Sequence, residues 1–306
     1  MSRITTVILV GFPNAEIFRV ILFTLLLLIY CGTICGNLMI ITLVSTSKNL
    51  HTPMYFFLTQ VSISDVILIT AIVPSILHFL LIEVRFMRLT LCIAQYNSFS
   101  FAVCLECLLL TVMSFDRYSA ICNPLRYSSI MNFRFCNVLA ALSWFLSMSL
   151  ICIESITISK LQFCGSNVIH HFFCDLYPLL KFSCIDTTMV QLEITILIVI
   201  LVVTPFVLII TSYICIIISI LKIHSLTQRR KVFSTCSSHL TVVCIFYGTI
   251  SSIYILPSKG GALPISRVLS LFYTVGTPIL NPIVYSLRNK ELNKALQKIH
   301  STIRDK

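Results

Sequence analysis

The stretch Met113–Tyr127 reads MSFDRYSAICNPLRY and comes at the end of a long apolar segment. Its adjacent opposite charges, Asp116 and Arg117, stand where a membrane-spanning helix should emerge into water. An ionisable group inside a bilayer is costly and usually functional, whereas a charge at the end of a span can reach the headgroups. The stretch therefore predicts either a functional charge pair or a simple membrane anchor, and the remaining sequence must decide between them.

The composition is that of a membrane protein. Apolar residues make up 57% of the 306 residues, charged residues make up 11%, and the mean hydropathy is +0.97. Seven continuous apolar runs of about 20 residues or more could each cross a bilayer as a helix, whereas barrel strands would alternate in polarity. The runs cover about residues 20–44, 55–81, 92–120, 138–158, 192–221, 232–256 and 265–286. The sequence predicts an all-α membrane protein, a seven-transmembrane helix bundle that forms a single domain over residues 1–306.

The basic residues predict the orientation of this bundle. If the amino terminus is extracellular, 14 of the 22 Lys and Arg residues lie on the cytoplasmic side and eight on the other side. The positive-inside rule favours this arrangement, with the carboxy terminus in the cytoplasm. The net charge of +11 then fits contact with anionic inner-leaflet lipid and a cytosolic partner. No basic face interleaved with aromatic residues suggests a nucleic-acid partner.

Four of the fourteen cysteines fall on the predicted extracellular side: Cys92, Cys164, Cys174 and Cys184. Disulfides persist in that oxidising compartment. Four cysteines allow three pairings, and their positions in the sequence do not choose among them.

Two acidic residues are predicted to lie inside the membrane. Asp65 is near the middle of the second apolar run, and Glu106 lies ten residues before Asp116. Two such carboxylates cannot both stay ionised and unpaired, so they must bind a cation, share a proton or find hydrogen-bond donors. Asn37 and Asn281, from the first and last runs, are suitable neutral partners. We expect a sodium-binding or protonated polar cluster, with a purely structural hydrogen-bond network as the alternative.

A series of motifs runs along nearly the whole chain. They are Gly36-Asn37, LHTPMYFFL at 50–58, Ser64-Asp65, the string from Asp116-Arg117-Tyr118 to Leu125, HHFFCD at 170–175, Ser212-Tyr213, KVFSTCSSHLTVV at 231–243 and PILNPIVYSLRN at 278–289. Together they resemble the vertebrate odorant receptors of the tetrapod type (class II), a branch of the rhodopsin-like G-protein-coupled receptors. The resemblance implies a rhodopsin-like bundle, and a receptor without catalytic residues.

The resemblance also implies roles for particular residues. It pairs Cys92 with Cys174 and Cys164 with Cys184. It makes Asp116 and Arg117 an activation latch that is closed at rest and opens when the receptor couples to a G protein. The other residues that it assigns to activation and coupling are Tyr118, Tyr213, His239, Asn281, Pro282 and Tyr285. Of these, Tyr213 and Tyr285 should meet Arg117 in the active state, and Pro282 should break the last helix. His239 could titrate or simply form a hydrogen bond, and we favour the hydrogen bond.

Helical spacing and the resemblance together place a mostly apolar ligand pocket among the extracellular halves of the spans. The predicted contacts are Phe99, Ser100, Val103, Cys104, Leu197, Ile198, Leu201, Tyr247, Ile250, Ser251, Tyr254 and Thr274. Because this set holds no carboxylate and no lysine, we expect a neutral or weakly polar ligand.

The end of the chain predicts one more helix. Leu292, Ala295, Leu296 and Ile299 follow the spacing of an apolar helix face within about residues 289–300. Lysines flank that face, which is typical of an amphipathic helix lying on the inner leaflet.

The resulting expectation is a multi-pass odorant receptor of the plasma membrane. It would bind small volatile molecules, activate a stimulatory olfactory G protein and raise cyclic AMP, with no cofactor other than a structural sodium ion. A transporter is one alternative, although no internal repeat pairs two interrupted helices. A receptor of this fold that does not reach the surface is another, because the chain has no Asn-x-Ser/Thr glycosylation acceptor.

Overall fold

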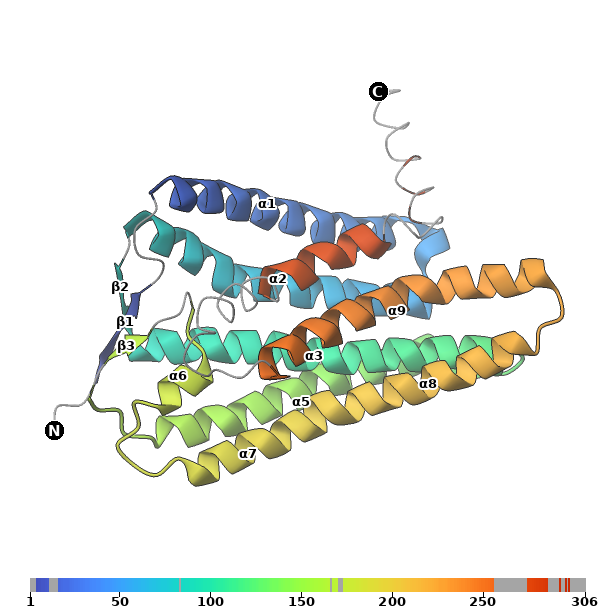
Figure 1. The fold of residues 1–306 in the computed structure, drawn as a ribbon. Coiled ribbons are helices and arrows are strands. Elements are labelled where there is room, and N and C mark those ends of the chain that lie inside the picture. Colours follow the sequence, from blue (N-terminus) through green and yellow to red (C-terminus); the bar gives the residue numbers. More distant parts are fainter. Residues whose placement is uncertain are drawn as a thin grey trace.

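The computed structural model describes residues 4–10, 16–82, 84–165, 167–169, 173–255 and 274–285, with the single positions 292, 295 and 297. Long helices form a bundle, and a small sheet lies across one end of it, here called the sheet end (Figure 1). Within the described ranges, five helical segments are long and apolar enough to cross a membrane. They are α1 (Glu16–Thr46), α2 (Pro53–Ile82), α3 (Leu89–Cys122), α5 (Phe133–Ser159) and the continuous rod Thr188–Leu221.

Two further helices complete the described part of the bundle. The first, α9 (Leu226–Ile255), has an apolar part at Cys236–Ser251 and a charged first section. The second covers residues 274–285. The predicted runs 20–44 to 232–256 therefore coincide with helices, which confirms the predicted fold class. Run 265–286 lies partly, and the predicted amphipathic helix 289–300 largely, outside the described residues.

Short elements connect the helices where the local sequence requires a turn. The 3-10 helix η1 (Lys48–Leu50) precedes α2, which begins at Pro53, a residue suited to the first helical turn. After α3 comes Pro124, which cannot continue the helix, and then the short α4 (Tyr127–Ile130). The side chain of Asn132 caps α5 by accepting a hydrogen bond from the Phe135 N–H at 2.9 Å.

The rod 188–221 contains a widened turn that the sequence analysis did not predict. It consists of α7 (Thr188–Ile198), a π-helical turn at Val199–Val203, labelled η2, and α8 (Thr204–Leu221). Pro205, in the first turn of α8, lacks an N–H group, and its ring would crowd the carbonyl four residues earlier. A π turn relieves that crowding, and such turns are frequent at functional sites.

A three-stranded sheet lies across the bundle at the sheet end. Its middle strand β1 (Thr6–Val10) pairs antiparallel with β2 (Val84–Arg88) and parallel with β3 (Val168–Ile169). Val7 and Leu9 point from β1 into the core, and neither is exposed. The amino-terminal segment is thus part of the packed structure, which the apolar-run analysis did not predict.

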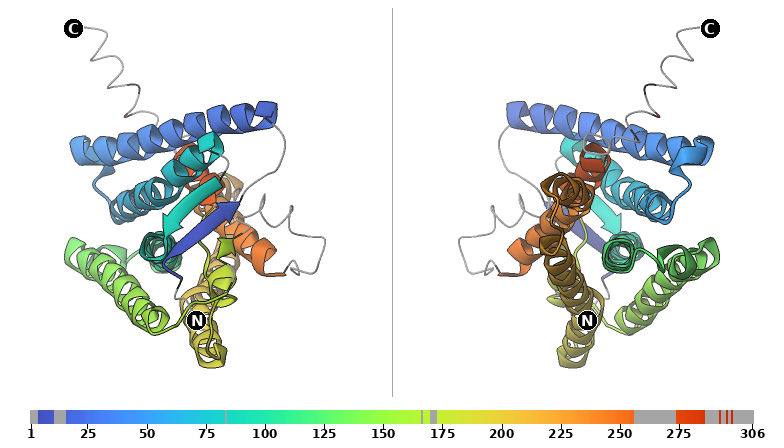
Figure 2. Two further views of the ribbon diagram at one scale, coloured as in Figure 1. Left: turned by 90° about the vertical axis from the view of Figure 1, so that its left-hand side faces the viewer. Right: turned by 90° about the vertical axis from the view of Figure 1, so that its right-hand side faces the viewer.

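Helix α3 is the centre of the bundle. Viewed along its axis, it lies among the other helices (Figure 2), and it contacts α2, α5, α8 and α9. Polar bonds inside the bundle add to the apolar core: the Trp144 indole N–H, for example, donates to Gln60 Oε1 at 3.0 Å and links α5 to α2. Large apolar side chains such as Leu28 and Phe145 remain exposed on the outside, as expected for surfaces that face lipid.

Gly36 allows α1 to approach the helix 274–285 closely. A Cβ atom at this position would lie 3.1 Å from Cβ and 3.3 Å from Cγ of Pro282. Gly32, one turn earlier and exposed, has nothing within 4 Å of the equivalent position. Small residues at helix contacts let backbones approach in membranes.

We expect Gly36→Val to destabilise the protein by about 1–3 kcal/mol, because its branched side chain would overpack against Pro282. Thermal unfolding of the purified protein measures this. Gly32→Val is the matched control and should change stability little, since Gly32 is exposed and a Cβ atom there has nothing within 4 Å. Equal stability of the two variants would contradict a close contact at Gly36.

Candidate functional site

Two disulfides hold the segment after α5 over the sheet end of the bundle. Cys92, in the first turn of α3, is bonded to Cys174, and Cys164 is bonded to Cys184. These are the pairings that the resemblance implies. Gln95 adds to this anchoring, because its Oε1 accepts from the Cys174 N–H at 3.1 Å while its Nε2 donates to the Ala71 carbonyl at 3.2 Å.

Below this segment lies a cavity of about 330 Å³, within the range of small-molecule sites. Its walls come from α3, the end of α5, α6 (Leu176–Leu180), α7 and the π turn η2. Aliphatic side chains dominate the lining, and polar groups occur at a few places, among them Tyr96, Ser100 and Thr195. Leu201, in the π turn, is one of the lining residues, so the widened turn forms part of the cavity wall.

Half of the predicted ligand contacts line this cavity: Ser100, Val103, Cys104, Leu197, Ile198 and Leu201. The others do not belong to the described lining. Phe99 packs against Phe173, with ring centroids 5.6 Å apart. Tyr247 is buried against Phe206, with ring centroids 4.6 Å apart.

Ile250 and Thr274 are also buried away from the cavity lining, and Ser251 is exposed. The side chain of Tyr254 lies outside the described residues.

Two carboxylic acids that the predicted ligand set omitted line the cavity: Glu154 on α5 and Asp175 before α6. Glu154 is 5% exposed, and its Oε1 accepts a hydrogen bond from the Tyr96 hydroxyl at 2.6 Å. Asp175 accepts from the Leu176 N–H at 2.7 Å, and burial raises the pKa of its carboxyl above the ordinary value. An acid inside an apolar run is a functional candidate by default, so Glu154 could have been found from the sequence.

The two acids that were predicted lie together at the centre of the bundle. The Asn281 side-chain amide donates to Asp65 Oδ1 and Oδ2 at 3.2 and 3.0 Å and to Glu106 Oε1 at 3.0 Å. All three side chains are at most 2% exposed. Asn37 instead donates to the Thr33 and Pro278 carbonyls, and its own Oδ1 is buried without a hydrogen-bond partner. The polar cluster therefore joins α2, α3 and the helix 274–285 through a single amide group.

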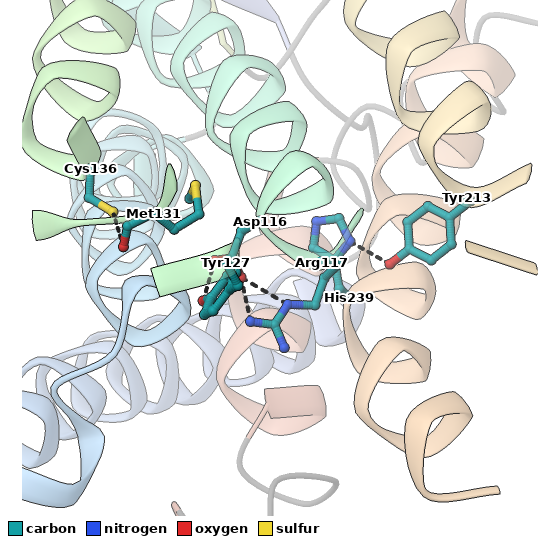
Figure 3. Close-up of polar contacts among 7 residues, drawn as sticks. All are labelled: Asp116, Arg117, Tyr127, Met131, Cys136, Tyr213 and His239. Carbon is teal, nitrogen blue, oxygen red and sulfur yellow. Dashed lines mark hydrogen bonds and ion pairs between the residues drawn. The ribbon is translucent and has the colours of Figure 1, made fainter. Parts of the chain in front are cut away.

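The opposite end of α3 holds the charge pair (Figure 3). Arg117 forms an ion pair with Asp116, with Nε 2.9 Å from Oδ2 and the terminal nitrogen also bonded to that oxygen. The Tyr127 hydroxyl donates to the other oxygen, Oδ1, at 2.8 Å. Asp116 is not exposed at all, and burial together with Asp116 raises the pKa of Tyr127. The pair is thus a closed contact between a buried acid and a partly buried arginine, and Tyr127 of α4 supports it.

Tyr213 and His239 connect α8 to α9 beside this pair (Figure 3). The Tyr213 hydroxyl lies 2.7 Å from His239 Nδ1, and the two rings stack with centroids 5.8 Å apart. His239 therefore forms the hydrogen bond that we favoured. Tyr213 and Tyr285 are both buried, and neither bonds to Arg117 in this structure. Tyr118 stacks on Phe115, and Pro282 lies within the helix 274–285 against Gly36.

Comparison with known proteins identifies the family. A family model described as olfactory receptor matches residues 26–302. The chain is 44% identical to human olfactory receptor 11L1 over 97% of this chain and 92% of that one. It is 45% identical to human olfactory receptor 5AN1 over 98% and 96% of the respective chains. The chain belongs to the olfactory receptor family. It is therefore a multi-pass membrane receptor rather than an enzyme.

The solved structures agree with the receptor's fold. Squid rhodopsin superimposes with a TM-score of 0.74 over 95% of the receptor and 87% of its own chain, at 15% sequence identity. The rhodopsin-like seven-transmembrane architecture predicted from the motifs is therefore confirmed.

We expect Tyr127→Phe to lower the free energy of unfolding of the receptor by about 1.5–3 kcal/mol, because the buried Asp116 carboxylate would lose a hydrogen-bond donor. Thermal unfolding in detergent is the measurement. Tyr118→Phe removes a hydroxyl of the same kind that makes none of these contacts, and it should change stability little. If the Tyr127→Phe receptor were as stable as the Tyr118→Phe control, the hydrogen bond between Tyr127 and Asp116 would not contribute to the stability of the receptor.

Proposed function

We propose that this protein is an odorant receptor of the plasma membrane that couples a small volatile ligand to a stimulatory olfactory G protein and so raises cyclic AMP. The observation that carries the proposal is the position of two sites on one helix. Ser100 and Cys104 of α3 line the cavity, and Asp116 and Arg117 of the same helix form the ion pair. The thirteen residues from Cys104 to Arg117 correspond to about 20 Å along a helix.

The orientation follows from the same arrangement. The sheet end carries the two disulfides, which persist in an oxidising compartment, so we assign it to the extracellular side. The end with Arg117, Arg126, Arg229 and Arg230 then faces the cytosol, in agreement with the positive-inside rule. A volatile ligand would thus enter from outside, and the G protein would meet the charged end.

The closed ion pair supports a resting state in this proposal. Arg117 is held by Asp116, while Tyr213, from the neighbouring helix, is held by His239. A ligand that favours a second arrangement would have to release Arg117 and exchange these partners, as a population shift requires. The G protein would bind the arrangement in which Arg117 is free.

Arg117→Ala should abolish ligand-evoked cyclic AMP in cells that express the receptor with the olfactory G protein. The measurement is gated on surface staining of an epitope tag, so that loss of expression is separated from loss of coupling. Lys222→Ala, at the end of α8, is a control that removes a charge outside the ion pair. Full retained signalling by Arg117→Ala at normal surface levels would refute the proposed coupling.

We further propose that the cluster of Asp65, Glu106 and Asn281 binds one positive charge, a sodium ion or a proton. Two carboxylates share a single amide donor, and no lysine or arginine of the described chain bonds to them. The donor set fits a small hard cation, because the groups of Asp65 and Glu106 that face the amide are carboxylate oxygens. A bound cation would offset the repulsion between the two acids and favour this arrangement.

Sodium and a proton are distinguished by Asp65→Asn. If sodium occupies the cluster, replacing potassium by sodium should raise the unfolding temperature of the purified wild-type receptor, and Asp65→Asn should remove that response. If a proton occupies it, the wild type should respond to pH and not to sodium. A wild-type receptor insensitive to both would leave the structural hydrogen-bond network as the explanation.

A further inference from the structure

The cavity is acidic, which changes the expected chemistry of its ligand. Glu154 and Asp175 line it, and no lysine, arginine or histidine belongs to the described lining. The expectation of a neutral ligand rested on a predicted contact set without a carboxylate. The cavity in the structure contains two carboxylates, those of Glu154 and Asp175.

Glu154 is the better placed of the two acids. It lies in the wall formed by α5, and one of its oxygens is taken by the Tyr96 hydroxyl at 2.6 Å. Its second oxygen, Oε2, makes no hydrogen bond within the described part of the chain. One oxygen of Asp175 already caps α6, which ties that acid to the loop.

Tyr96 holds the Glu154 carboxylate at the cavity wall. Both side chains are nearly buried, at 8% and 5% exposure, and Ser100, one turn further along α3, interacts with the Tyr96 phenol. A carboxylate oriented by such a bond is pre-positioned for a ligand, which lowers the cost of ordering it on binding.

A cationic ligand best satisfies this arrangement. A buried carboxylate without a charged partner is costly, and a hydrogen-bonded cation offsets that cost. A carboxylic acid ligand would instead bring a third negative group into the cavity. The remaining walls are aliphatic, with Val103, Ile198 and Leu201 among them, and they suit a hydrocarbon skeleton.

We propose that Glu154 is the ligand anchor of this cavity and that the receptor prefers small volatile primary amines, bound as ammonium ions at Glu154 with the hydrocarbon part against the aliphatic walls. This inference rests on the proposed function for its signalling readout. It concerns the ligand class and not the coupling, so a binding measurement tests it separately.

The test uses primary alkylamines with linear, cyclic and arylalkyl skeletons, each paired with the alcohol and the carboxylic acid of the same skeleton. Cyclic AMP is measured in surface-gated cells, and the unfolding temperature of the purified receptor is measured with each compound. The amines should act at concentrations about tenfold below those of the matched alcohols, because hydrogen bonds between charged groups are stronger. The carboxylic acids should be inactive.

Glu154→Gln keeps the shape of the side chain and removes its charge. It should raise the concentration of amine needed for a half-maximal response by about tenfold and leave the response to alcohols nearly unchanged. Glu154→Asp keeps the charge and should retain a preference for amines. Asp186→Asn is the matched control, because Asp186 is an exposed acid before α7 that accepts from the Thr188 hydroxyl at 2.6 Å and is absent from the described lining.

The outcomes separate the two proposals. Amines that raise the unfolding temperature of the wild type but not of Glu154→Gln would support Glu154 as the ligand anchor, even if the cyclic AMP level does not change. An unchanged cyclic AMP level would in that case contradict the proposed coupling to the G protein. Alcohols or acids that activate the receptor at least as well as the amines would overturn the inference and leave the odorant-receptor function intact. An unfolding temperature unchanged by every amine, or equal amine responses of wild type and Glu154→Gln, would also overturn it.

Discussion

The structure depends on one constraint of the bilayer: polar groups away from water must find their partners inside the protein. An apolar side chain packs against lipid almost as favourably as against another helix. The few hydrogen bonds between helices therefore determine much of which helices pair with each other. A single amide, that of Asn281, reaches Asp65 on α2 and Glu106 on α3. Tyr96 and Glu154 make the corresponding link between α3 and α5 nearer the sheet end.

Helix α3 takes part in each of these links and in the charge pair at the opposite end. It contributes Tyr96 to the cavity, Glu106 to the central cluster and Arg117 to the ion pair. The three sites therefore lie on one helix, so the proposed coupling between the cavity and the ion pair needs no separate element to connect them. The energetic requirement is differential: a ligand shifts the receptor only as far as it binds one arrangement better than the other.

The helices could be predicted because hydrophobic length is a direct physical demand of the membrane, and the motifs then identified the family. The disulfide pairings followed from the resemblance to that family, and Asn281 was predicted as a partner of Asp65 because a buried carboxylate needs a hydrogen-bond donor. The strand β1 could not be predicted in this way. It pairs with β2 and β3, which lie far away in the sequence, and a short apolar segment does not indicate such partners. The π turn before Pro205 was not predicted either. It affects which side chains of the rod 188–221 face the cavity, so it matters for the packing of the bundle and not only for the rod itself.

The position of Glu154 shows where spacing arguments fail for a binding site. Helical spacing together with the family resemblance assigned the pocket to α3, the rod 188–221, α9 and the helix 274–285, and six of the predicted residues do line the cavity. The end of α5 and the disulfide-held segment before α6 close the same space, and they bring Glu154 and Asp175 with them. Because a charge inside an apolar wall outweighs many dispersion contacts, these two acids change the chemistry of the cavity more than the six aliphatic and small polar positions do. The proposed preference for amines therefore rests on acidic side chains that the predicted contact set did not include.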